Sequence, residues 1–132
     1  MTRDANAPGA YVLVVEDDPV LCKLLRWMLE DEGIRVRSAS NGLDALEQAK
    51  QQRPSLVILD LGLPILNGEE FATELRHLYR SSDPPVIVVS GDTATSLRAR
   101  AIGAAAFFQK PFDIDEMASQ VAKVLDRAAH VA

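Results

Sequence analysis

Short, uninterrupted apolar runs constrain the fold of this chain more than any other feature of its sequence. Three of them are rich in β-branched residues and lie at Val12–Val15, Leu56–Leu59 and Val86–Val89. Because apolar and polar residues do not alternate within them, each run predicts a strand covered on both faces, as in a parallel sheet between two helical layers. Two weaker strands are predicted at Ile34–Ala39 and Ala104–Gln109.

Helical patterns, with apolar residues three or four positions apart, fill the gaps between the predicted strands. The first helix has Asp18 as its expected N-cap and Pro19 at its first helical position. Asn67, which is followed closely by two Glu residues, and Asp113 are expected to cap two later helices. These signals place helix starts shortly after the strands end.

The fourth helical pattern, at about 93–102, is the weakest, because Leu97 and Ile102 are its only large apolar anchors. Strand and helix nevertheless alternate five times. Right-handed crossovers then give a doubly wound α/β fold with a five-stranded parallel sheet and five helices. The sequence does not determine the strand order, and we take the order 2-1-3-4-5 from flavodoxin-like doubly wound sheets.

The length of 132 residues has room for one folded domain, which we expect at 10–127 between a flexible segment at 1–9 and a tail at 128–132. A net charge of −5 disfavours a nucleic-acid surface. The apolar runs are far shorter than the ~20 residues that span a bilayer, and residues 1–9 lack the apolar core of a signal peptide. Since the lone Cys22 cannot form an internal disulfide, we expect a cytoplasmic protein.

Polar residues follow the predicted strands at the point where each strand ends. Glu16 and Asp17 follow the first run, Asp60 follows the third strand, Ser90 the fourth and Lys110 the fifth. Ligands of open parallel sheets bind at the carboxyl ends of the strands, so we expect these side chains to meet at one edge. Each of them alone has an ordinary explanation as a turn or surface residue, but their joint occurrence favours a site.

The charges of this predicted site call for a cation. The carboxylates of Glu16, Asp17 and Asp60 carry three negative charges, and Lys110 offsets only one. Crowded like charges repel each other unless a counter-charge lies among them. Oxygen ligands select a hard ion, and a site of few carboxylates beside a phosphate is typical of Mg²⁺. The sequence therefore predicts a Mg²⁺ site.

Four segments follow one another in a recognisable order: Val14–Pro19, Leu59–Pro64 with Asn67-Gly68, Val88–Ser90, and Gly103–Ala104 through Lys110–Phe112. Together they resemble the receiver domain of two-component response regulators, in particular the single-domain receivers of chemotaxis. The resemblance extends over residues 10–127.

The resemblance implies a role for each residue of the predicted site. Asp60 would be the phosphoacceptor, and Mg²⁺ would be held by Glu16, Asp17 and Asp60 together with the backbone carbonyl of Gly62. Ser90 and Lys110 would contact the phosphoryl group. The resemblance also implies a switch that couples Ser90 to an aromatic side chain three positions before the lysine, which is Phe107, and a cis peptide bond before Pro111.

The resemblance further implies partners. A histidine kinase or a histidine phosphotransfer protein would be the phosphodonor, which fits the lack of any Gly-rich nucleotide-binding loop. A downstream protein would dock on the face made by the fourth helix, the fifth strand and the fifth helix. The chain shows no DNA-binding or catalytic domain, so we expect it to act alone through partner binding or to be a fragment.

Two other classes of protein share features with the receiver domain that the sequence resembles. Haloacid-dehalogenase-type phosphatases also use an aspartyl nucleophile with Mg²⁺, but they need a second Asp two positions later, where this chain has Gly62. A phosphorylation-independent interaction module would not need the site residues, all of which are present. We therefore expect a phosphoacceptor switch rather than an enzyme.

Overall fold

All five strands lie in one parallel sheet, in the order β2-β1-β3-β4-β5. A computed structural model describes residues 9–130, so the expected flexible segment at 1–9 lies outside the described residues apart from Gly9. The predicted doubly wound fold and its strand order are confirmed. The strands are β1 (Val12–Val15), β2 (Val36–Ala39), β3 (Leu56–Asp60), β4 (Val86–Ser90) and β5 (Ala106–Gln109).

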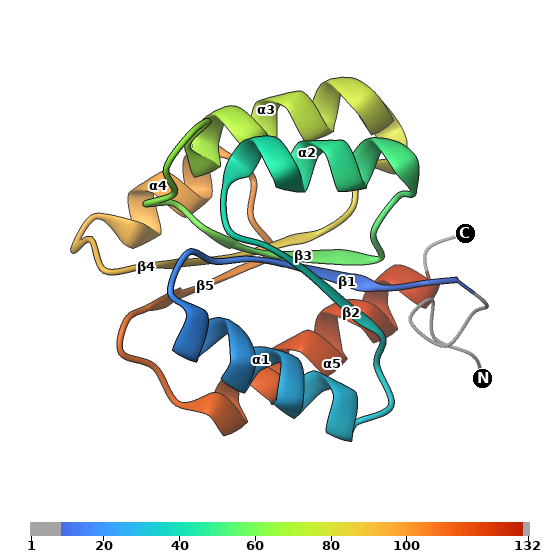
Figure 1. The fold of residues 1–132 in the computed structure, drawn as a ribbon, viewed down its shortest axis with the longest axis vertical. Helices are drawn as coiled ribbons and strands as arrows, with labels where there is room; N and C mark the ends of the chain where they lie inside the picture. Colours follow the sequence, from blue (N-terminus) through green and yellow to red (C-terminus); the bar gives the residue numbers. More distant parts are fainter. Residues whose placement is uncertain (1–8, 131–132) are drawn as a thin grey trace.

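Helices cover both faces of the sheet (Figure 1). The helices α2, α3 and α4 pack on one face, whereas α1 and α5 pack on the other. The last helix continues through His130, into the segment 128–132 that we expected to be a tail, and residues 131 and 132 lie outside the described residues. The helices are α1 (Pro19–Asp31), α2 (Gly42–Gln51), α3 (Gly68–Tyr79), the short 3₁₀ helix η2 (Arg80–Ser82), α4 (Thr95–Ala101) and α5 (Ile114–His130).

The two helical layers explain why the strand sequences are continuously apolar. Successive strand residues point to opposite faces, so a strand covered on both sides needs apolar residues at every position. In β1, Leu13 and Val15 pack in the core that includes α2 and α3, while Val12 and Val14 pack in the core that includes α1 and α5. All four side chains are fully buried.

The expected helix caps are present. The Asp18 carboxylate accepts hydrogen bonds from the backbone N–H of Val20 and Leu21, at 3.0 and 3.4 Å. Asn67 and Glu70 form a reciprocal capping box, in which each side chain accepts a hydrogen bond from the other residue's backbone N–H. These caps start α1 and α3 at the ends of the loops that follow β1 and β3, which are the loops next to the candidate site.

The prediction that Leu97 and Ile102 anchor α4 is partly wrong. The helix is seven residues long and buries Thr95 and Ala99, which lie one turn apart on one face. Leu97 is two positions from each of them, so it lies on the opposite side of the helix and is 67% exposed. Ile102 follows the helix and packs only partly against the core. The fourth helix is therefore anchored by small side chains.

The end of the sheet at β5 is more open than its centre. Every residue of β1, β3 and β4 is buried, but β5 alternates between partly buried and exposed residues. The peptide bond between Lys110 and Pro111, which follows β5, is cis as expected. None of the described helices is both long enough and apolar enough to cross a membrane.

Candidate functional site

The carboxyl ends of four neighbouring strands bring the predicted site residues together. Asp60 and Ser90 are the last residues of β3 and β4, while Glu16 and Lys110 follow β1 and β5 directly. Backbone hydrogen bonds hold these positions, because Glu16 N–H donates to the carbonyl of Ala39 and Lys110 N–H donates to that of Ser90. Glu16, Asp60 and Ser90 are buried, so rigid strands set where their polar groups lie.

The ammonium group of Lys110 lies between the two buried carboxylates. Its Nζ donates hydrogen bonds to Oε2 of Glu16 and to Oδ2 of Asp60, both at 3.1 Å. The other Asp60 oxygen, Oδ1, accepts a hydrogen bond from the backbone N–H of Gly62 at 2.9 Å. One cation thus joins Glu16 and Asp60, which lie 94 and 50 positions before Lys110 in the sequence. Sequence analysis predicted this grouping from the strand ends alone.

Burial and hydrogen bonding shift the pKa values of Glu16 and Lys110. Desolvation raises the pKa of Glu16 from 4.5 to about 7. Hydrogen bonds from Lys110 and from the Asp18 backbone N–H lower this pKa, whereas the nearby negative charge of Asp60 raises it further. Burial alone would lower the pKa of Lys110, but its hydrogen bonds to Glu16 and Asp60 outweigh this effect and the pKa is raised. The lysine therefore stays charged, while the carboxylates remain incompletely neutralised.

The acidic residues fit a hard divalent cation. One carboxylate oxygen from each of Glu16, Asp17 and Asp60 lies within 4.8 Å of the others. The Oε1 atom of Glu16 is buried and forms an ion pair with the Lys110 ammonium at 2.9 Å, without a hydrogen bond of good geometry. Asp17 is exposed and opens this cluster to solvent. An all-oxygen set that combines buried and solvent-accessible carboxylates is suited to Mg²⁺.

The hydroxyl of Ser90 is held by the turn that follows it. Its Oγ accepts a hydrogen bond from the backbone N–H of Asp92 at 3.0 Å, and the Asp92 carboxylate in turn accepts one from Ala94 N–H at 2.8 Å. Asp92 thus organises the turn before α4, and the N-cap position itself belongs to Ala94. Among the described residues, no hydrogen bond links Ser90 to Asp60.

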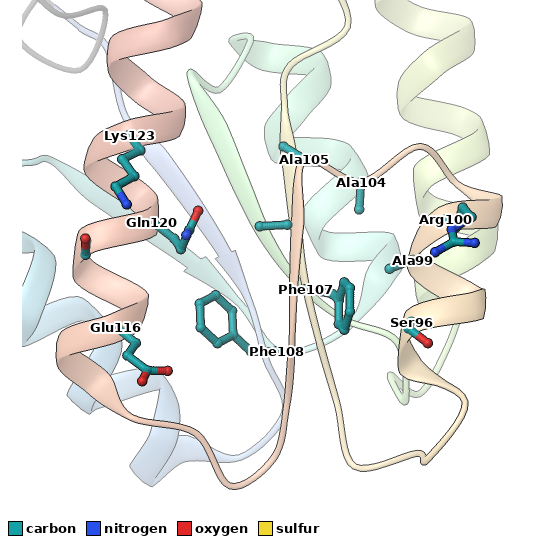
Figure 2. Close-up of a pocket in the computed structure, with 12 residues that line it drawn as sticks. Ser96, Ala99, Arg100, Ala104, Ala105, Phe107, Phe108, Glu116, Gln120 and Lys123 are labelled. Carbon is teal, nitrogen blue, oxygen red and sulfur yellow. The ribbon is translucent and has the colours of Figure 1, made fainter.

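Phe107 lies within β5, an outermost strand of the sheet, and not at the strand ends that carry the carboxylates. Figure 2 shows its ring beside β5 on the side of α4, whereas the ring of Phe108 lies on the side of α5. The Phe107 side chain is 49% exposed, so it is not a core residue in this arrangement. Space for a side-chain rearrangement therefore exists at the surface beside α4.

Two glycines leave the rim of the site open. A Cβ atom added at Gly91 would meet nothing within 4 Å, and one added at Gly62 would meet only Oδ1 of Asp60, at 3.6 Å. Neither glycine has a positive φ, so neither is required by the backbone conformation. The Asp60 carboxylate, though mostly buried, is therefore not covered by a side chain at Gly62.

An arginine that sequence analysis missed lies next to the site. The guanidinium of Arg98 in α4 donates to both carboxylate oxygens of Glu69 in α3, each at 2.7 Å. It also donates to Oδ2 of Asp92 at 3.1 Å and to the carbonyl oxygen of Leu61 at 3.4 Å. Arg98 and Glu69 are 29 positions apart, on two helices whose approach no local pattern predicts.

This fold, with acidic residues, a serine and a lysine at its strand ends, defines a receiver-type domain, and the comparisons with known proteins agree. The chain matches the response regulator receiver domain over residues 12–122. It belongs to this family and is a two-component response regulator domain.

Curated relatives and solved structures support this assignment. The chain is 39% identical over 118 residues to the KDP operon transcriptional regulatory protein KdpE of Escherichia coli, covering 88% of this chain and 51% of the relative. It is 33% identical over 129 residues to the probable transcriptional regulatory protein TcrX of Mycobacterium tuberculosis, covering 95% and 53%. The chain therefore spans about half the length of these relatives.

Among solved structures, the receiver domain of a putative LuxO repressor protein from Vibrio parahaemolyticus has a TM-score of 0.80 and 30% identity, with 89% of this chain and 91% of that chain covered. A CheY-like response regulator receiver domain protein from Methanospirillum hungatei has a TM-score of 0.81 and 25% identity, with 90% and 95% covered.

Proposed function

We propose that this domain accepts a phosphoryl group on Asp60 and that the modification changes the binding of a partner protein. The observation that carries the proposal is the partly buried Lys110 ammonium, which donates hydrogen bonds to Asp60 and Glu16 at the carboxyl ends of β3 and β1. A cation fixed beside a carboxylate can hold the oxygens of a phosphoryl group while that carboxylate attacks.

The transfer uses the carboxylate of Asp60 as nucleophile. A carboxylate oxygen forms a bond to phosphorus, and the bond from phosphorus to the donor breaks, so that the donor atom keeps the electron pair. With a phosphohistidine donor, the leaving imidazole nitrogen becomes an ordinary ring nitrogen; with a small acyl phosphate, the leaving group is a carboxylate. Lys110 balances the charge of the phosphoryl oxygens, and Ser90 offers them a hydroxyl donor.

Glu16, Asp17, Asp60 and the backbone carbonyl of Gly62 would hold Mg²⁺ in this proposal. The bound ion supplies positive charge to the phosphoryl oxygens and to the crowded carboxylates. The close approach of carboxylate oxygens from Glu16, Asp17 and Asp60 and the exposure of Asp17 support the assignment. The role of the Gly62 carbonyl rests on the family resemblance, because its own N–H is the group that contacts Asp60.

A histidine kinase or a histidine phosphotransfer protein is the proposed phosphodonor, and a downstream protein is the proposed reader of the modified state. The α4-β5-α5 face offers that reader a hollow of about 650 Å³ (Figure 2). Exposed Phe107 lies at this hollow, with Lys123 and Glu116 from α5 on its other side. Apolar and charged groups of this kind suit a reversible protein contact.

The residue two positions after Asp60 argues against a phosphatase. Gly62 has no carboxyl group that could activate water two positions after Asp60. Loss of the phosphoryl group is therefore expected to be slow compared with an enzyme's turnover, which suits a switch.

Intact-mass spectrometry tests the proposal directly. After incubation with Mg²⁺ and acetyl phosphate, the wild-type chain should gain one phosphoryl group, and Asp60→Asn should gain none. Asp31→Asn is the matched control, because Asp31 is an exposed carboxylate at the end of α1 and should leave modification unchanged. Equal modification of Asp60→Asn and wild type would show that Asp60 is not the acceptor.

A further inference from the structure

The helix α4 has little apolar contact to hold it in place. It buries only Thr95 and Ala99, and it has no side-chain N-cap hydrogen bond. Leu97, its largest apolar side chain, points to solvent. A short helix with so few buried contacts belongs to the least stable part of a fold, so its position depends on polar contacts.

Arg98 supplies the main polar contacts of this helix. Its guanidinium makes a two-point ion pair with Glu69 and also bonds to the Asp92 carboxylate and to the Leu61 carbonyl. The planar, five-donor group of an arginine suits such a multiple contact, which a lysine would not reproduce. One side chain of α4 therefore connects the first turn of α3, the turn after β4 and the residue that follows Asp60.

The contact with Asp92 leads directly to Ser90. The Asp92 backbone N–H donates to the Ser90 hydroxyl, while the Asp92 side chain is paired with Arg98. If Ser90 moves toward a phosphoryl group on Asp60, the turn that contains Asp92 has to change. The pairs that Arg98 makes with Glu69 and Asp92 oppose that change, because they hold the turn against α3.

We propose that Arg98 is a positioning residue that latches α4 and the turn after Ser90 in the unphosphorylated arrangement, through its ion pairs with Glu69 and Asp92. This inference rests on the proposed function. The latch opposes both phosphorylation and the movement of α4, because the protein has to loosen these ion pairs before Ser90 can reach the phosphoryl group. Without the latch, the switched arrangement should be easier to reach, and ligands that favour it should bind more tightly.

The partial burial of the ion pair between Arg98 and Glu69 sets how much its loss should change the affinity for a switching ligand. The side chains of Arg98 and Glu69 are 28% and 37% exposed, so solvent screens their attraction only in part. Hydrogen bonding to Arg98 lowers the pKa of Glu69, which therefore remains ionised at neutral pH. Breaking a pair of this kind should change the affinity for a switching ligand about 3- to 10-fold.

Beryllium trifluoride with Mg²⁺, an aspartyl-phosphate mimic, is the probe for this latch. Titration calorimetry of Arg98→Gln and of Glu69→Gln should each show about 3- to 10-fold tighter binding than wild type. Arg35→Gln and Glu74→Gln are the matched controls, since both residues are exposed and far from Asp92 in sequence, and Glu74 lies on the same helix as Glu69. Both controls should bind like wild type.

A charge-swapped pair separates the latch from a general loss of structure. Combining Arg98→Glu with Glu69→Arg should return the affinity toward that of wild type, whereas each swap alone should bind the mimic more tightly. Wild-type or weaker binding by Arg98→Gln and Glu69→Gln would overturn the latch while leaving phosphorylation of Asp60 intact. Absence of binding by the wild-type chain would overturn both the latch and the proposed function.

Discussion

Asp17 is the residue at which the proposed metal site is most open to test. Unlike Glu16 and Asp60, it is exposed, and no ion pair or hydrogen bond with another described residue occupies its side chain. It still lies within 4.8 Å, oxygen to oxygen, of the two buried carboxylates. Its contribution to metal binding can therefore be removed without disturbing the apolar core.

We predict that Asp17→Asn weakens Mg²⁺ binding by about tenfold or more while the domain stays folded. Removal of one of three negative charges lowers the attraction for a divalent cation, and the exposed position spares the packing. Titration calorimetry with Mg²⁺ measures the effect, and Asp31→Asn serves as a control for the loss of an exposed charge elsewhere on the surface. Equal Mg²⁺ affinity in Asp17→Asn and wild type would remove Asp17 from the site.

Single residues of the site differ in how well their positions follow from the sequence. Asp60, Ser90 and Lys110 were predictable because each follows an apolar run, and parallel strands bring such positions to one edge. The tie between Arg98 and Glu69 was not predictable, since it depends on how α3 and α4 approach each other across 29 positions. Residues placed by regular strands can be read from the sequence, whereas contacts between helices require the packed structure.

At the scale of elements, α4 shows how a helix can form with little help from apolar residues. Leu97 was predicted to anchor it but lies on the exposed side, because Thr95 and Ala99 face the core. A two-residue error in helical phase reverses the face that a side chain occupies. The structure thus corrects which residues hold the helix, and it supports the expectation that α4 is weakly anchored.

We predict that an aspartyl-phosphate mimic changes the amide hydrogen exchange of 93–102 and of the backbone around Phe107. A phosphoryl-like group at Asp60 gives Ser90 a new acceptor, and movement of Ser90 alters the turn that leads into α4. Exchange measured with and without beryllium trifluoride and Mg²⁺ tests this, with α2 as the internal control on the same face of the sheet. Protection changes restricted to the strand ends would contradict a switch that reaches the α4-β5-α5 face.

At the scale of the whole molecule, the sheet and its two helical layers form a frame to which the site is attached at one edge. The core runs through both faces of β1, β3 and β4; Asp60 and Ser90 end β3 and β4, and Glu16 follows β1 directly. This arrangement separates stability from switching, because the groups that hold the frame together are the apolar side chains of the core, whereas the site consists of polar groups at the strand ends. It also explains why the fold was predictable: continuous apolar strands and alternating helices admit few other topologies.

This separation predicts that the same substitution at two leucines changes the free energy of unfolding by very different amounts. Leu13→Ala should destabilise the domain by about 2–5 kcal/mol, because Leu13 is fully buried in a central strand and the change leaves a cavity. Leu97→Ala should change stability by less than about 0.5 kcal/mol, since Leu97 is 67% exposed. Urea unfolding followed by circular dichroism and by the fluorescence of Trp27 measures both, and coincident transitions are expected for a single domain of this size. A cost at Leu97 comparable to that at Leu13 would mean that α4 is part of the stable frame, and the account of α4 as a weakly held element would then be wrong.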